Sequence, residues 1–264
     1  MSQTDANNQK NLRLKWIGCE VFFRMASRIA ATSPHTIDMT FTTLQSHAIA
    51  KELHEKIQAA IDGCDPKTYD AILLGYGLCG NATAGLKASG IPLVIPRAHD
   101  CCALFLGSRQ KFKEHFEHRL SAKWSSHGYL ERTDDYLGGT QLGESLGFDK
   151  QYQEFVEEYG EEDAAYLWET LHPQKFNKEK IYIEVEPFEQ LHFYERFIEK
   201  LKADDIFKAD EPNHVFFEDT TIEILQGSDT IIHKLLWGEW DEDFLVVKPG
   251  EEIKPDYSLM GVFA

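Results

Sequence analysis

Short apolar segments that alternate with helix-length segments constrain the fold of this chain most strongly. Residues 71–75 and 91–95 are almost wholly apolar, and residues 81–88 between them are long enough for a helix. Strands of a parallel sheet that is covered on both faces have this apolar character. The two segments therefore predict neighbouring strands in the interior of an α/β fold.

The same alternation runs through most of the chain. β-branched and apolar segments predict further strands at residues 12–19, 36–42, 181–185, 221–225 and 244–247. Helical spacing predicts helices at 21–31, 47–61, 150–159, 163–172, 188–202 and 229–236, whereas the glycine-rich residues 124–148 indicate a long loop. We expect two Rossmann-like lobes with mainly parallel sheets covered by helices, the first over residues 12–125 and the second over 126–264.

Charge is distributed unevenly between these lobes. The chain has 27 Lys and Arg against 44 Asp and Glu, a net charge of −17, yet its first 125 residues have a small basic excess. The acidity therefore belongs to the second lobe. It argues against a nucleic-acid or anionic-membrane partner, because both need basic surface.

No segment approaches the roughly 20 apolar residues that span a bilayer, and the N-terminal residues are polar. We expect a cytoplasmic protein. In that reducing compartment the five cysteines, all before residue 103, would be free thiols, catalytic groups or metal ligands.

Three predicted strand ends each deliver a cysteine. Cys19 follows the first strand, Cys79 follows the strand at 71–75, and Cys101 follows the strand at 91–95. Ligands of open parallel sheets bind beyond the carboxyl ends of the strands, so these thiols and His99 are expected to share a site. Thiolates and imidazole suit zinc, iron or an iron–sulfur cluster. The spacing matches neither a zinc ribbon nor a ferredoxin, which leaves the metal open.

Other residues of the same loops could bind a ligand. Gly75 and Gly77 allow close approach of the backbone, and Asn81 could cap a following helix. Gly75, Gly77 and Gly80 also have the spacing of a dinucleotide fingerprint, although the acidic residue expected about 20 residues on is not clear. Ser108 and Arg109 precede a helical segment and could bind an anion, or act only as a helix cap and a surface arginine.

The residues around these loops resemble a prokaryotic family, the domain of unknown function numbered 1638. The resemblance rests on residues 69–81, 92–101 and 104–109, together with Gly18-Cys19-Glu20 and residues 238–250. The chain departs from the family pattern at Cys102, Ala82 and Ala84, which makes Cys102 the least expected ligand. The motif positions that the resemblance implies are Cys19, Glu20, Cys79, Asn81, Arg97, His99, Asp100, Cys101, Ser108 and Arg109.

The resemblance implies little about activity. Members of the family often occur in anaerobic bacteria and methanogens beside corrinoid-dependent methyltransferases. This association suggests a role in corrinoid-linked methyl-group metabolism, with a corrinoid as a cofactor and a corrinoid protein or methyltransferase as a partner.

The leading hypothesis is a metal- or metallocofactor-binding protein with Cys19, Cys79, Cys101 and His99 as ligands. Glu20 and Asp100, with His99, would orient ligands or move protons, and Arg97 and Arg109 would bind an anionic group of a substrate or cofactor. One alternative is a binding module that holds a corrinoid or methylated small molecule without a metal of its own. Another is a thiol enzyme with Cys79 as nucleophile and His99 as base.

Overall fold

The structure is a computed structural model of the chain. It describes residues 11–44, 50–79, 81–117, 119, 122–133, 178–207, 216–258 and 261–263, with four isolated positions at 137, 156, 160 and 161.

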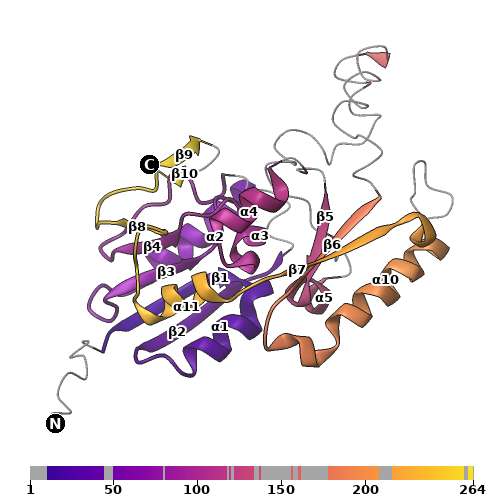
Figure 1. Cartoon of the computed structure of the whole chain (residues 1–264). Coiled ribbons are helices and arrows are strands. Elements are labelled where there is room, and N and C mark those ends of the chain that lie inside the picture. Colours follow the sequence, from indigo (N-terminus) through magenta and orange to yellow (C-terminus); the bar gives the residue numbers. More distant parts are fainter. Residues whose placement is uncertain are drawn as a thin grey trace, which may run out of the picture.

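A five-stranded sheet in the order β2-β1-β3-β4-β8 forms one half of the molecule (Figure 1). Its parallel strands are β1 (Arg13–Cys19), β2 (Thr36–Thr42), β3 (Ala71–Gly75) and β4 (Leu93–Pro96). β8 (Phe244–Val247) joins the edge antiparallel to β4. Every residue of β3 and β4 is buried, which explains their continuous apolar sequence.

The strand order reverses at β1. The chain passes from β1 through a 3-10 helix, η1 (Glu20–Phe22), and α1 (Phe23–Ala30) to β2 on one side. It then crosses back through α2 (Ala50–Asp62) to β3 on the other side of β1. Because such crossovers are right-handed, α1 and α2 cover opposite faces of the sheet, and β1 and β3 flank a topological switch point. α11 (Thr230–Trp237) lies beside α1 (Figure 1).

A second sheet is parallel throughout, in the order β5-β6-β7. Its strands are β5 (Lys123–Ser126), β6 (Glu179–Glu184) and β7 (Thr221–Gln226). α5 (His127–Arg132) follows β5, while η3 (Phe188–Leu191) and α10 (Phe193–Phe207) follow β6, and η4 (Phe217–Asp219) precedes β7. Phe193, Phe197 and Leu201 of α10 pack on Leu130 and Tyr182 in a small core of their own.

The two sheets are joined by close packing. Gly128 in α5 lies against the backbone of η1, where a Cβ would overlap the Val21 carbonyl group. One large core extends from β1 and β3 through Phe105 to Trp124 of β5 and Ile183 of β6. The carboxyl end of β5 therefore lies next to the carboxyl end of β1.

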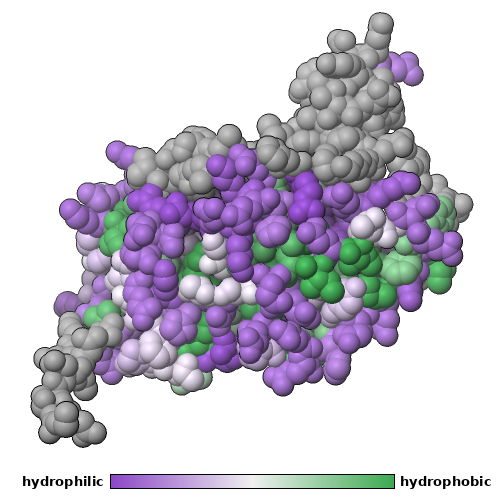
Figure 2. Space-filling model, viewed as in Figure 1, coloured by the Kyte–Doolittle hydropathy of each residue, from purple (hydrophilic) through white to green (hydrophobic). Residues whose placement is uncertain are grey.

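Two helices, α3 (Cys101–Leu106) and α4 (Arg109–Phe116), and an antiparallel pair of strands, β9 (Pro255–Ser258) and β10 (Gly261–Phe263), complete the described elements. Figure 2 shows a face covered mainly by hydrophilic side chains, with apolar side chains over the region of β7. Within the described residues, no helix has the length and apolar character needed to cross a membrane.

The predicted α/β fold with mainly parallel sheets is confirmed. The strands predicted at 36–42, 71–75 and 244–247 have the observed bounds. The helix predicted at 81–88 is wrong, because Asn81 has φ of 68° and residues 81–85 form turns. The loop predicted at 124–148 is wrong at its start, where β5 ends and α5 follows. The helices predicted at 150–159 and 163–172 lie largely outside the described residues.

The predicted lobes were divided between residues 125 and 126. β5 of the second sheet begins at Lys123, and the late strand β8 completes the first sheet. The division into domains stays a prediction.

Trp16 explains why two neighbouring glycines are needed in this sheet. Its buried indole lies across the register pair Gly18 and Gly75. A Cβ on Gly18 would lie 2.6 Å from the indole, and one on Gly75 would overlap it.

Replacement of Gly75 by Ala is expected to lower the free energy of unfolding by about 1–3 kcal/mol, because the rigid indole has to move within a packed core. Urea unfolding measures the change. The control is Gly63→Ala, whose new Cβ would have the Ala59 carbonyl oxygen as its nearest neighbour, at 3.4 Å. Equal stability of the Gly75→Ala variant and the wild type would contradict this account of the packing.

Candidate functional site

The carboxyl ends of β1, β3 and β4 bring three cysteines into one buried cluster. Cys19 ends β1, Cys79 lies four residues after β3, and Cys101 begins α3 after β4. All three are buried. Cys79 and Cys19 lie near Cys101, because both contribute, after burial and Asp100, to the raised pKa of the Cys101 thiol.

Backbone contacts fix the loop that carries Cys79. The amides of Leu78 and Cys79 donate to the carbonyl oxygens of Ala98 and His99 at 2.9 and 3.1 Å. Gly77 allows this approach, since a Cβ there would lie 2.6 Å from the Asp100 nitrogen. Cys79 itself has φ of 51°, a left-handed conformation that is uncommon for a residue with a side chain. Strained positions of this kind concentrate at functional sites.

Two tyrosines and an aspartate lie in the same cluster. The Cys101 Sγ and the Tyr129 hydroxyl group are 2.8 Å apart and share a hydrogen bond. Tyr76 shares a hydrogen bond of 2.7 Å with the Thr42 hydroxyl group, and its pKa is raised by burial and by Cys19 and Cys79. Asp100 is buried, and its side chain accepts from the Ala103 amide at 3.3 Å as the N-cap of α3.

This surrounding keeps the thiols of Cys19 and Cys101 protonated. Burial raises the pKa of Cys19 to about 12, and Glu20 adds to the increase. Burial and then Asp100, Cys79 and Cys19 raise the pKa of Cys101 well above its ordinary value. A cation in the cluster would reverse these effects, because it would stabilise the thiolates.

The described residues contain no ready-made metal site. No group of three or more His, Cys, Asp or Glu side chains in that part of the chain has an arrangement that could hold an ion. Cys19, Cys79 and Cys101 thus share a cluster without metal-ligand geometry, and whether they are ligands stays a prediction.

His99 lies beside α4, where its ring stacks on Phe112 with a centroid distance of 6.0 Å. Glu20 lies at the edge of a pocket, where its carboxylate accepts from the Leu44 amide at 2.7 Å. Cys102 is buried in α3 and Cys64 lies at the end of α2, where its thiol donates to the Ala60 carbonyl oxygen at 3.2 Å.

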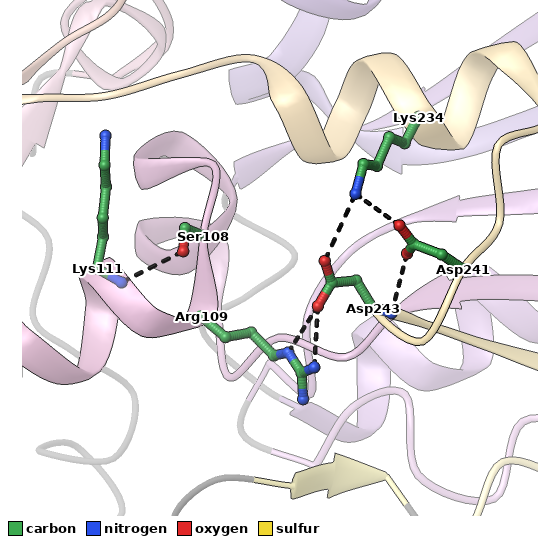
Figure 3. A network of polar contacts seen from close by, with 6 residues as sticks. All are labelled: Ser108, Arg109, Lys111, Lys234, Asp241 and Asp243. Carbon is green, nitrogen blue, oxygen red and sulfur yellow. Dashed lines mark hydrogen bonds and ion pairs between the residues drawn. The ribbon is translucent and has the colours of Figure 1, made fainter.

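The proposed anion-binding residues have structural partners. Ser108 caps α4 by accepting from the Lys111 amide at 3.3 Å. Arg109 donates to Asp243 Oδ1 from Nε and Nη2, at 3.1 and 2.9 Å. Figure 3 shows that Asp243 also faces Lys234, which binds Asp241 at 2.6 Å. This network ties α4 to α11 and the segment before β8.

Arg97 lies beside the same segment, since its amide donates to the Asp243 carbonyl oxygen at 2.7 Å.

Gly75 packs directly against the Trp16 indole, which leaves no room there for a ligand. Asn81 caps no helix, and without a helix after it the glycine pattern lacks the helix N-terminus that a dinucleotide fingerprint uses.

The carboxyl end of β5 adds polar residues that the sequence analysis missed. Ser125, Ser126 and His127 are fully buried. Their side-chain polar atoms make no hydrogen bond within the described structure. The sequence Trp-Ser-Ser-His-Gly is compatible with the end of a strand and the start of a helix. The glycines that follow it instead favour a loop, and these polar residues are therefore not predicted as part of a site.

His127 is enclosed by aromatic rings, with centroid distances of 4.3 Å to Phe188, 5.4 Å to Phe105 and 5.9 Å to Phe193. Burial, with a smaller effect of Arg24, lowers its pKa to about 3. The unfolded chain binds a proton at His127 below about pH 6.5 and the folded protein does not. Stability from this group is therefore present above pH 6.5 and is lost as the pH falls toward 3.

His127 stays neutral in the folded protein, so lowering the pH from 7 to 5 is expected to reduce the free energy of unfolding by about 2 kcal/mol through this group. Urea unfolding at both pH values in a His127→Gln variant should show a pH dependence smaller by that amount, whatever the variant's absolute stability. The control, His192→Gln, removes an exposed histidine and should keep the wild-type dependence. An unchanged dependence in His127→Gln would show that the histidine titrates normally.

Comparison with known proteins gives one match. The model of the family described as "Protein of unknown function (DUF1638)" matches residues 41–202, which include Cys79, His99, Cys101 and Tyr129. Neither the curated proteins nor the solved structures contain a match. Because the matched segment is more than half of the chain, the protein belongs to the DUF1638 family.

Proposed function

We propose that the protein binds a metal ion or a metal-containing cofactor through the thiolates of Cys19, Cys79 and Cys101. The observation that carries the proposal is the meeting of three thiols, from the ends of three neighbouring parallel strands, in one buried cluster. Thiolate ligands favour zinc, iron or an iron–sulfur cluster over magnesium or calcium.

The electrostatics of the cluster support a cation. After burial, the groups that raise the pKa of Cys101 are acidic: Asp100, Cys79 and Cys19. Burial and then Cys101 and Cys19 likewise raise the pKa of Tyr129. A bound cation removes this repulsion and releases protons from the thiols, so that its affinity would rise with pH.

The sulfur atoms would have to move toward a shared ion, since the described groups have no ready-made ligand geometry. A change of side-chain rotamer moves a cysteine sulfur without moving the backbone. His99, whose ring stacks on Phe112, would complete the ligand set through a ring nitrogen. Its role as a fourth ligand, like those of Glu20 and Asp100 in proton transfer, remains part of the proposal.

The thiol-enzyme alternative has less support. A nucleophilic cysteine needs a lowered pKa or an adjacent base. The pKa values of Cys19 and Cys101, which share the cluster with the candidate nucleophile Cys79, are instead raised, and the described ring contact of His99 is with Phe112. A link to corrinoid-dependent methyl transfer, with a corrinoid or a methyltransferase as partner, rests on the family resemblance alone.

Metal analysis tests the proposal. Protein purified without oxygen should contain close to one equivalent of zinc or iron, or iron with acid-labile sulfide. Cobalt(II) added to the metal-free protein should give a thiolate-to-metal charge-transfer band, because cobalt replaces zinc in tetrahedral thiolate sites. Substitution of Cys19, Cys79 or Cys101 by Ser should weaken metal binding at least tenfold.

Cys64→Ser is the matched control, since Cys64 is also a buried thiol but lies at the end of α2. It should bind metal as the wild type does. Less than about 0.2 equivalents of any transition metal, together with no cobalt charge-transfer band, would overturn the proposal, because a built thiolate site binds such ions tightly.

Tyr129 gives a second prediction of the same proposal. Its hydroxyl group would donate to the Cys101 thiolate across the 2.8 Å contact and hold that ligand in place. Tyr129→Phe should therefore lower metal affinity by about tenfold and shift the cobalt charge-transfer band. Tyr182→Phe, which changes a buried tyrosine of the other core, should do neither. Identical affinity and spectrum in Tyr129→Phe would exclude this positioning role.

A further inference from the structure

A pocket between the two sheets lies next to the cysteine cluster but has different chemistry. Its volume is about 750 Å³, within the range of small-molecule sites. Its lining residues are Glu20, Thr43 and Leu44 from the carboxyl ends of β1 and β2, residues 130–133 from the end of α5, and Arg196 and Lys200 from α10.

Three cations line this pocket: Arg132, Arg196 and Lys200. The two lining carboxylates have partners of their own. Glu131 accepts two hydrogen bonds of 2.8 Å from Arg24, and Glu20 accepts from the Leu44 amide at 2.7 Å. In a chain with a net charge of −17, the described lining thus has more basic than acidic side chains.

Packing holds the two arginines in place. The Arg132 guanidinium lies 4.6 Å from the ring centroid of Phe23, and its buried Nε makes no hydrogen bond within the described structure. Arg196 lies 5.1 Å from the Phe193 centroid and donates to the Leu130 carbonyl oxygen at 3.4 Å. Guanidinium groups oriented in advance lose little entropy when they bind an anion.

Arg196 and Lys200 are four residues apart in α10, so both extend from one face of the helix. The pocket is larger than a single phosphate or carboxylate group requires, so the remaining volume would hold the rest of a molecule.

We infer that this pocket binds a small organic anion with at least two negative charges, carried on phosphate or carboxylate groups. Arg132, Arg196 and Lys200 contact the charged groups. The inference does not depend on the metal proposal, because none of these residues belongs to the cysteine cluster.

Calorimetric titration of metal-free protein with pyrophosphate and with succinate tests the inference, at constant ionic strength and with a chelator present. Either anion should bind saturably, and the one that binds identifies phosphate or carboxylate as the preferred group. Succinamide, the uncharged counterpart of succinate, should not bind. Arg196→Gln and Lys200→Gln should each weaken binding about tenfold, because each removes a charge-assisted hydrogen bond.

The matched control is Lys202→Gln, which removes one positive charge from the same helix. Lys202 is exposed and lies over the Phe217 ring, away from the pocket lining. Its loss should change affinity less than twofold. The inference is overturned if neither anion binds saturably below about 10 mM, the weak end of specific recognition, or if Lys202→Gln weakens binding as much as the two pocket variants do.

Discussion

The packing of Trp16 against Gly18 and Gly75 is the constraint on which the rest of the structure depends. The indole is buried across two strands, and only glycine leaves room for it at both positions of this register pair. β1 and β3 therefore end side by side, at the switch point of the sheet. Cys19 and the loop that carries Cys79 begin directly beyond this pair.

The second sheet closes the cysteine cluster from the other side. Tyr129 in α5 reaches Cys101, while Gly128 allows α5 to pack against the η1 backbone directly after Cys19. Neighbouring residues then face two environments. Cys19 and Tyr129 belong to the buried cluster, and Glu20 and Leu130 line the basic pocket. The two proposed sites are thus adjacent but chemically distinct.

The sequence predicted the elements whose pattern is local. The strand at 71–75 is apolar because it is covered on both faces, so its bounds could be predicted from composition alone. The meeting of three cysteine-bearing strand ends was also predictable, since parallel strands end at one edge. Pairing between distant segments was not predictable, because β8 joins β4 only through tertiary packing. The strand β5 and the helix α5 were not predicted, because the glycines after residue 127 are typical of a loop. Without α5, the role of Tyr129 and the pocket between the two sheets were not predicted either.

X-ray absorption at the metal edge of the reconstituted protein tests the central proposal most directly. A thiolate site gives sulfur neighbours at about 2.3 Å from the ion, fewer in Cys79→Ser and unchanged in Cys64→Ser. A shell of nitrogen and oxygen alone, at about 2.0–2.2 Å, would contradict the proposal, because the ion would then lie outside the cysteine cluster.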